Sequence, residues 1–215
     1  MGNCAAKRSE SNEQKSRPEK LTGSAEPTID AVDYSSSEIC QFNYAFEEVV
    51  VAFFKSKLRP SKADFISPFQ IEKLEDRIVF RREETRTVDV PWLLKKICDP
   101  TFVMAHEISI FPNENRLEVY VKNSSHLDYG LVSDQEIYTK GEGLSKTTLR
   151  RKIGVELSSE KSWFGLKSTA EKWLKKKSKV LFSKTDEKLE NILEEEPSLD
   201  KYFPFILDGY LEYLE

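Results

Sequence analysis

The chain has 215 residues, enough for one ordinary domain and a tail, and its 39% hydrophobic residues suffice for a packed interior. Its net charge of −4 argues against nucleic-acid binding, and its three cysteines include no CxxC pair, so they support neither a disulfide framework nor a zinc site. No apolar run approaches the roughly eighteen residues that cross a bilayer, so we expect any contact with a membrane to be at its surface.

The first segment of the chain resembles an N-myristoylation signal, because removal of the initiator Met would expose Gly2. The strict motif has Ser or Thr where this chain has Ala6. One myristoyl chain binds a bilayer only marginally, so stable attachment needs a second anchor, and Cys4 is the candidate for palmitoylation. Residues 9–38 are rich in Ser, Glu, Lys and Pro. We therefore expect residues 1–38 to form a disordered, acylated tether; the alternative is an ordinary disordered tail.

The first predicted elements are a strand and a helix. Phe42, Tyr44 and Phe46 alternate with polar neighbours, as in a short strand, and residues 47–58 then contain an apolar run typical of a buried helix. Later segments alternate with a period of two, which predicts strands over residues 69–74, 77–87, 102–111, 116–123, 129–138 and 149–157. A Pro-Asn-Glu-Asn run at residues 112–115 predicts the turn of a hairpin.

A short amphipathic segment, residues 91–97, lies between two of these strands and contains Trp92, Leu93 and Leu94. Two interpretations are open for it. The segment is either a brief helix packed into the core or a mobile lid over an interior cavity, where the two lysines that follow would meet lipid phosphates.

A helical period replaces the strand pattern from residue 162 to residue 196, without an internal Pro, and predicts one long helix. Antiparallel strands followed by an amphipathic helix predict an α+β domain over residues 39–196, in which a curved antiparallel sheet is closed by the helix. Such an arrangement leaves room for a cavity between helix and sheet. Residues 197–215 form an acidic and aromatic tail, which either docks a partner or packs back on the domain.

Three lysines of the predicted helix, Lys177, Lys184 and Lys188, fall within about a quarter of its circumference. Their side borders the apolar side, to which we assign Leu181 and Phe182. Lysine stems can lie along apolar surface while their ammonium groups reach a phosphate, so the pattern fits an anionic lipid headgroup beside its acyl chains. The alternative is a solvated basic face.

One strand supplies a further headgroup candidate. Arg81 and Arg82 point to opposite sides of a strand, and of the two we favour Arg82. The alternative is that these arginines pair across the strands with Glu83 or Glu84.

No pattern in the sequence indicates catalysis. His106 and His126 are its two histidines, and each stands without a Cys or carboxylate at ligand spacing, so we expect them to be structural. There is no nucleophile elbow and no Gly-rich phosphate loop. We therefore expect a protein that is not an enzyme, with no metal and no cofactor, whose ligand is a bound phospholipid.

Several segments occur in an informative order: VAFFK from residue 51, VPW from residue 90, ISIFPNENRL from residue 108 and SWFGLKS from residue 162. Together they resemble the PRELI/slowmo family over residues 42–193. The resemblance implies a START-like lipid cavity, transfer of an anionic glycerophospholipid and a small helical partner in the mitochondrial intermembrane space. It also implies headgroup contacts for Lys177 and Lys184. Lys55 joins the candidates because it flanks Ser56, where the family often has Arg.

These patterns lead us to expect a protein that binds, and transfers or senses, an anionic glycerophospholipid such as phosphatidic acid or phosphatidylserine. N-terminal acylation would hold it on the cytoplasmic face of a membrane, and the alternative location, implied by the resemblance, is the mitochondrial intermembrane space. The alternative function is a membrane-anchored protein-interaction module without lipid transfer. The expected partners are phospholipid, a membrane surface and, by resemblance, the small helical protein, with no nucleic acid.

Overall fold

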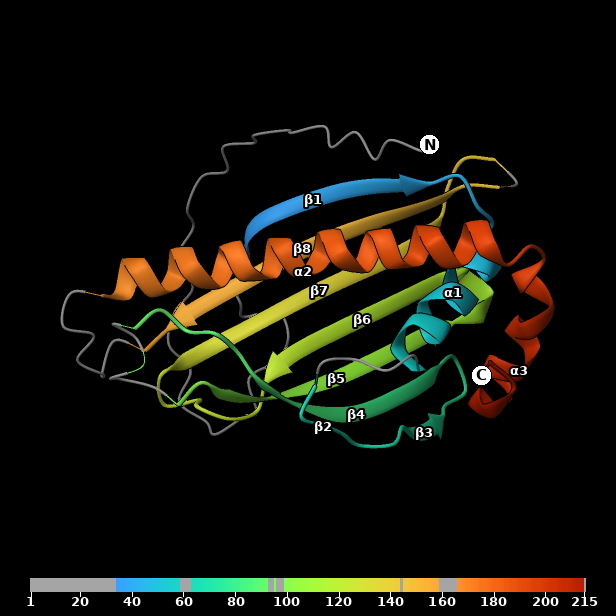
Figure 1. Cartoon of the computed structure of the whole chain (residues 1–215). Coiled ribbons are helices and arrows are strands. Elements are labelled where there is room, and N and C mark those ends of the chain that lie inside the picture. The colour runs from blue at the N-terminus through green and yellow to red at the C-terminus, as the bar shows by residue number, and fades with distance from the viewer. Residues whose placement is uncertain are drawn as a thin grey trace, which may run out of the picture.

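The computed structural model describes residues 34–58, 63–92, 95, 99–143, 145–158 and 166–214 (Figure 1). The predictions made for Gly2, Cys4, Leu93 and Leu94 lie outside these residues.

A curved antiparallel sheet forms one layer of the fold. Its strands are β1 (Tyr34–Phe42), β2 (Phe65–Ile66), β3 (Gln70–Lys73), β4 (Ile78–Thr87), β5 (Thr101–Phe111), β6 (Arg116–Asn123), β7 (Gly130–Lys140) and β8 (Thr147–Leu157). Strands β4 to β8 form a meander, β1 pairs with β8 at one edge, and β2 and β3 both pair with β4 at the other. The long helix α2 (Lys167–Glu195) lies across the concave side (Figure 1). The predicted fold class, an α+β domain with a curved antiparallel sheet closed by a C-terminal helix, is confirmed.

The turn between β5 and β6 is the predicted hairpin. It contains the short helix η3 (Pro112–Glu114), and Asn115 follows it with a φ angle of 46°. Asn tolerates this left-handed conformation better than most residues, which is why this residue type ends the turn.

The first helix, α1 (Phe46–Leu58), begins where the sequence predicts the end of a strand. That part of the prediction is wrong, because β1 has already ended and Phe46 is the first helical residue. The carboxylate of Glu48 accepts a hydrogen bond from the backbone N–H of Ala45 at 3.0 Å, which satisfies an amide before the first turn. The fold also begins earlier than residue 39, since β1 is paired with β8 from Tyr34 onward.

Helix α1 is buried on all sides at its centre. Its residues from Val49 to Phe54 have 0% exposure. The helix contacts the concave face of the sheet, α2 and the C-terminal residues, so it has no solvent-facing side and needs no polar stripe.

The C-terminal residues pack back on the domain. They form η4 (Leu199–Tyr202), α3 (Phe203–Leu207) and η5 (Leu211–Leu214). Four of their apolar side chains are buried in the same core as α1: Leu199, Ile206, Leu211 and Leu214. The boundary expected near residue 197 therefore does not separate a detached tail from the domain.

Helix α2 has 29 residues, and its buried side chains include Ser178, Phe182 and Leu189. The helical period predicts Leu181 on the apolar side, but this side chain is 46% exposed. That assignment is wrong, because the helix is rotated so that polar Ser178 faces a part of the sheet that carries ionisable side chains. None of the helices in the described ranges combines the length and the apolar character of a membrane span.

Candidate functional site

The register of the sheet arranges its inward side chains in rows, because directly opposed residues of an antiparallel pair lie on the same side of the sheet. The row nearest α1 contains five apolar residues, Ile78, Ile110, Leu117, Tyr138 and Leu149. All five are buried in the main core. At this end of the concave face the side chains are packed together, which leaves no room for a ligand among them.

Farther along the strands, the inward side chains become ionisable. They are Arg82 and Glu84 of β4, His106 of β5, Asp134 and Glu136 of β7, and Arg151 of β8. We call these six residues the charged layer. Five of them are at most 8% exposed, and Asp134 is half-buried. Since a buried charge is unfavourable without a partner, the contacts of each group show where the layer is complete and where it is not.

On the β8 side of the charged layer each charge has a partner of opposite charge, although Nε of Arg151 makes no hydrogen bond with a described residue. The guanidinium of Arg151 donates to both carboxylate oxygens of Asp186 on α2, at 2.6 and 2.5 Å, and its Nε lies 3.4 Å from the carboxylate of Glu136. The same group lies over the ring of Phe182, 4.7 Å from its centroid. The hydroxyl of Tyr138 donates to Glu136 at 2.6 Å. These bonds fasten α2 to the sheet and compensate the charges that they join.

Glu84 lies between two basic residues of β4 and β5. Arg86 donates through Nε to its carboxylate, and the Nε2 atom of His106 lies 3.4 Å from it. Burial alone would raise the pKa of Glu84, but the hydrogen bonds with His106 and Arg86 outweigh burial and hold the pKa at about 2. Burial lowers the pKa of His106. Glu84 is therefore an anion at neutral pH, and it neutralises one of the charges of β4.

Asp134 has the opposite shift. Burial, followed by the nearby charge of Glu136, raises its pKa to about 7, although a hydrogen bond with Ser178 of α2 acts in the other direction. Its Oδ1 atom has no hydrogen-bond partner among the described residues. This carboxyl group is thus close to half protonated at neutral pH.

The β4 side of the charged layer is incomplete. One nitrogen of Arg82 donates to the carbonyl of Lys57, the penultimate residue of α1, at 3.1 Å, but its Nε atom has no partner in the part of the chain that the structure describes. The guanidinium also lies over the ring of Phe69, 4.6 Å from its centroid. Nδ1 of His106, the residue directly opposite Arg82, likewise has no partner among those residues.

Lys57 adds a second cation to this side. Its ammonium lies 5.1 Å from the centroid of the Phe53 ring and makes no ion pair or hydrogen bond with a described residue. Burial lowers its pKa, the nearby charge of Glu136 acts in the other direction, and the charge of Arg82 lowers the pKa further. Burial also lowers the pKa of Arg82. Two neighbouring cations with unfilled hydrogen-bonding capacity therefore face the interior, and an anion placed between them would satisfy both.

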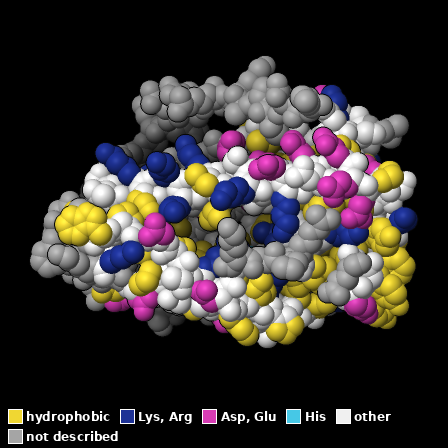
Figure 2. Space-filling view, viewed as in Figure 1, with side chains coloured by type: hydrophobic (Ala, Val, Ile, Leu, Met, Phe, Trp, Pro, Cys, Tyr) yellow, Lys and Arg dark blue, Asp and Glu magenta, His cyan; other side chains and the backbone are white. Residues whose placement is uncertain are grey.

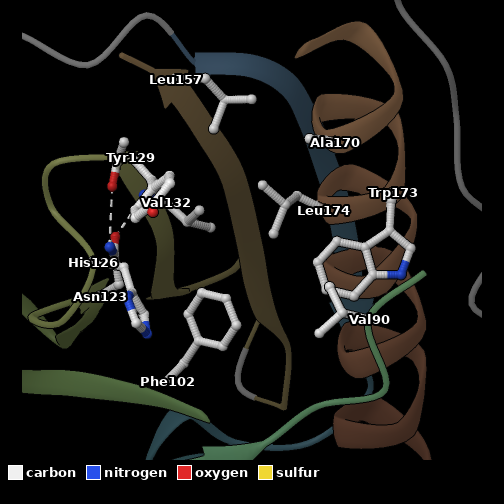
Figure 3. Close-up of a pocket in the computed structure, with 11 residues that line it drawn as sticks. Val90, Phe102, Asn123, His126, Tyr129, Val132, Leu157, Ala170, Trp173 and Leu174 are labelled. Carbon is white, nitrogen blue, oxygen red and sulfur yellow. Dashed lines mark hydrogen bonds between the residues drawn. The ribbon is translucent and has the colours of Figure 1, made fainter. Parts of the chain in front are cut away.

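An apolar pocket lies at the far end of the concave face, under the N-terminal half of α2 (Figure 3). Figure 3 shows Trp173 and Leu174 of α2 on one side and Phe102 and Val132 of the sheet on the other. The full lining consists of Val90, Phe102, Asn123, His126, Tyr129, Gly130, Val132, Leu157, Ala170, Trp173 and Leu174.

The two most polar side chains of the lining are occupied by the backbone. Asn123 donates to the carbonyls of Ser125 and Gly130 and accepts from the N–H of Val132, and Nε2 of His126 lies 2.9 Å from the carbonyl of Thr101. The wall therefore presents mainly hydrocarbon, which suits an apolar ligand.

Accessible side chains connect the charged layer to this pocket. Met104 and Val121 face inward beside Glu84 and His106, yet both remain half-buried rather than closed off. In the row nearest α1, by contrast, no residue is more than 8% exposed. Inward side chains two residues apart on a strand are separated by roughly 7 Å. The cations and the pocket therefore lie about two rows of inward side chains apart on the same concave face.

Of the lysines predicted from the sequence, Lys177 and Lys184 are exposed on α2. Lys188 donates to the carbonyl of Ser56 at 2.6 Å, and Lys55 forms an ion pair with Glu196. Lys188 and Lys55 thus connect α1 to the C-terminal part of α2.

The predictions for the other candidates can be placed individually. Arg82 points inward, as the period of two predicts, while Arg81 points outward and pairs with Glu72 and Glu107. Glu84 pairs with Arg86 of the same strand, and not with an arginine across the strands as the alternative predicted. Trp92 is 66% exposed, so this residue of the candidate lid is not packed into the core.

Sequence reasoning missed Lys57 and most of the charged layer. A signal was present in β4, where Arg82, Glu84 and Arg86 continue the alternate positions of Ile78 and Phe80. Ionisable residues at inward positions of a half-buried strand contradict the ordinary pattern, and such violations concentrate at functional sites.

A family model described as the PRELI-like family matches residues 47–198. No curated protein matches the sequence. Solved structures that resemble the chain include human STARD10 (TM-score 0.46, 9% identity, 85% of this chain and 75% of that chain). Another is norcoclaurine synthase from Thalictrum flavum in complex with dopamine and hydroxybenzaldehyde (TM-score 0.45, 11% identity, 85% of this chain and 100% of that chain). Since the family match spans more than half of the sequence, the chain belongs to the PRELI-like family.

Proposed function

We propose that the protein binds one anionic glycerophospholipid, such as phosphatidic acid or phosphatidylserine, between α2 and the sheet, and transfers it between membranes. Lipid binding as such follows from membership of the PRELI-like family. The identity of the headgroup and the transfer step are the parts that we add.

One observation supports the choice of an anionic headgroup. Lys57 and Arg82 are neighbouring cations that face the interior with hydrogen-bonding capacity left unfilled by the described residues. A phosphate between them would accept charge-assisted hydrogen bonds from both. The phosphocholine headgroup of phosphatidylcholine would in addition bring a cation toward this positive side without the extra carboxylate that phosphatidylserine carries, which is unfavourable.

The acyl chains would extend from this site toward the apolar pocket. Met104 and Val121 provide accessible apolar surface along the way, and the pocket wall under α2 offers mainly hydrocarbon. Burial of each CH₂ group contributes about 0.8 kcal/mol, so even part of one chain would bind with substantial free energy. Binding of this kind requires no catalytic group.

The segment that contains Trp92 remains our candidate for a lid over the pocket. Its exposed ring lies two residues after Val90, which lines the pocket. A lid at this position would cover the apolar chains between two membranes. Acylation at Gly2 and Cys4 would keep the protein at the cytoplasmic face of one membrane, and the mitochondrial intermembrane space with a small helical partner is the alternative implied by the family resemblance.

Transfer between liposomes tests this function. Donor liposomes carry fluorescent phosphatidic acid or fluorescent phosphatidylcholine, and we expect the full chain to accelerate transfer of the anionic lipid selectively. The double variant Lys57→Gln/Arg82→Gln should lose this selectivity. Lys122→Gln/Arg150→Gln removes two exposed outward charges and should behave as the wild type. Equal transfer of both lipids by the wild type, or no transfer of either, would contradict the proposal.

A further inference from the structure

The outer side of α2 combines exposed lysines with exposed aliphatic residues. Val180 and Leu181 are 45% and 46% exposed, although neither is at a helix end. Lys176, Lys177 and Lys184 are exposed around them. With 3.6 residues per turn, these five residues fall within less than half of the circumference, and we call them the outer patch.

The charge of α2 is strongly asymmetric along its length. Between residues 172 and 184 there are six lysines and no acid, whereas the acids Asp186, Glu187, Glu190, Glu194 and Glu195 follow in the C-terminal part. Figure 2 shows the same division on the surface, with basic side chains over the N-terminal part of α2 and acidic side chains over its C-terminal part. A negatively charged partner would therefore contact the N-terminal part.

The outer patch and the pocket use the same part of the helix. Trp173 and Leu174 line the pocket and lie seven residues before Val180 and Leu181, so each pair shares one side of the helix. The C-terminal part, by contrast, is fastened to the sheet through Asp186 and to α1 through Lys188. A surface that binds the outer patch would thus lie next to the helix segment that covers the pocket.

We propose that the outer patch is the surface by which the protein docks on an anionic lipid bilayer. The negative surface potential of the bilayer attracts the lysines. The aliphatic side chains of Val180 and Leu181 enter the headgroup region, as in helices that lie at a membrane interface. A bilayer fits this patch better than an acidic protein does, because exposed aliphatic residues stand among the lysines, which are spread along about two and a half turns. The inference rests on the proposed function, since docking here brings the pocket to its source of lipid.

Vesicle co-sedimentation of the full chain, produced without acylation, tests the docking surface. Vesicles consist of phosphatidylcholine alone or with 30% phosphatidylserine, and we expect binding to the anionic vesicles that weakens with salt. The triple variant Lys176→Gln/Lys177→Gln/Lys184→Gln should bind about fivefold more weakly for each lysine removed. Val180→Ser/Leu181→Ser should also weaken binding, and this loss should persist in high salt.

The control variant Lys122→Gln/Lys140→Gln/Lys146→Gln removes the same charge from exposed positions of the sheet and its turns, and should bind like the wild type. Equal binding by the wild type and the outer-patch triple variant, or no binding of the wild type to either vesicle, would overturn the docking surface. Native mass spectrometry of the same samples separates this result from the proposed function, because the triple variant should still retain its interior lipid.

Discussion

The guanidinium of Arg151 and the carboxylate of Asp186 form a bidentate ion pair with N–O distances of 2.6 and 2.5 Å. This ion pair joins the inward side of β8 to α2. Arg151 is 1% exposed. The bond lies at the junction of two regions of the helix: beyond it Leu189 and Ile192 enter the main core, and before it the helix covers the charged layer and the pocket. It therefore fixes how the helix sits over the interior.

Asp186→Asn should destabilise the protein by about 3 kcal/mol, because it leaves the buried Arg151 without its main partner. Urea denaturation at neutral pH measures the change. The triple variant Arg151→Met/Asp186→Leu/Glu136→Gln also removes the second carboxylate that faces Arg151, and should recover most of the loss. If the triple variant were as unstable as the single one, packing rather than the unpaired charge would be the cause.

The pKa of Asp134 predicts a pH dependence of stability. A folded-state value of about 7, above the ordinary 3.8, means that the folded protein holds a proton that the unfolded chain releases. The stability associated with this proton is fully present below pH 4 and is lost as the pH rises through 7. Asp134→Asn should therefore stabilise the protein at pH 8 by roughly 3 kcal/mol relative to wild type, and hardly at all at pH 4.

Urea denaturation at pH 4, 6 and 8 checks this prediction. Asp128→Asn, an exposed change in the loop before β7, serves as the control. A stabilisation by Asp134→Asn that does not vary with pH would show that its ionisation is not responsible.

Glu84 predicts the reverse dependence. Its pKa of about 2 lies below the ordinary 4.5, so its ionised form contributes stability above pH 4.5 that is lost as the pH falls toward 2. Glu84→Gln should destabilise the protein by roughly 3 kcal/mol at pH 7, because Arg86 and His106 lose their carboxylate. Glu83→Gln, an exposed neighbour on the opposite side of β4, should change stability by less than about 0.5 kcal/mol. Thermal unfolding between pH 3 and pH 7 should show the penalty of Glu84→Gln shrinking with acidity.

A substitution at Val132 tests whether the pocket is unfilled space that can take a ligand. Its half-buried side chain lines the pocket, so Val132→Phe should project a ring into it, displace acyl chain and lower lipid retention at least tenfold. Stability should change by less than about 1 kcal/mol, because unfilled space accepts the ring. A destabilisation of roughly 1 to 3 kcal/mol, the usual cost of overpacking, would instead indicate a packed interior. Leu131→Phe, on the outward side of the same strand, is the control.

The sequence predicts the strands and the long helix well because their periods are determined by one buried side. It predicts Arg82 as inward for the same reason. It does not predict that Leu181 is exposed while Ser178 is buried, because the rotation of α2 is set by what the sheet presents to it.

The partners of Arg151 and Glu84 could not be predicted from the sequence either. Arg151 bonds to Asp186, 35 residues away, and the inward position of Glu84 gains meaning only when β5 places His106 beside it. In the sequence, nothing distinguishes Lys57 from Lys55, which is also near the end of α1. Only the fold places Lys57 near Arg82. Pairings of this kind depend on strand order and register, which a single sequence does not specify.

Native mass spectrometry of the full chain purified from cells tests the central claim most directly. The wild type should retain one phospholipid with an anionic headgroup, and Lys57→Gln/Arg82→Gln should lose it or retain a mixture without preference for charge. Loss of two charge-assisted contacts corresponds to roughly a hundredfold weaker binding. Lys122→Gln/Arg150→Gln should retain the same lipid as the wild type. A wild-type protein that carries no lipid, or a double variant that keeps the anionic lipid at wild-type occupancy, would contradict the assignment of Lys57 and Arg82 as the headgroup site.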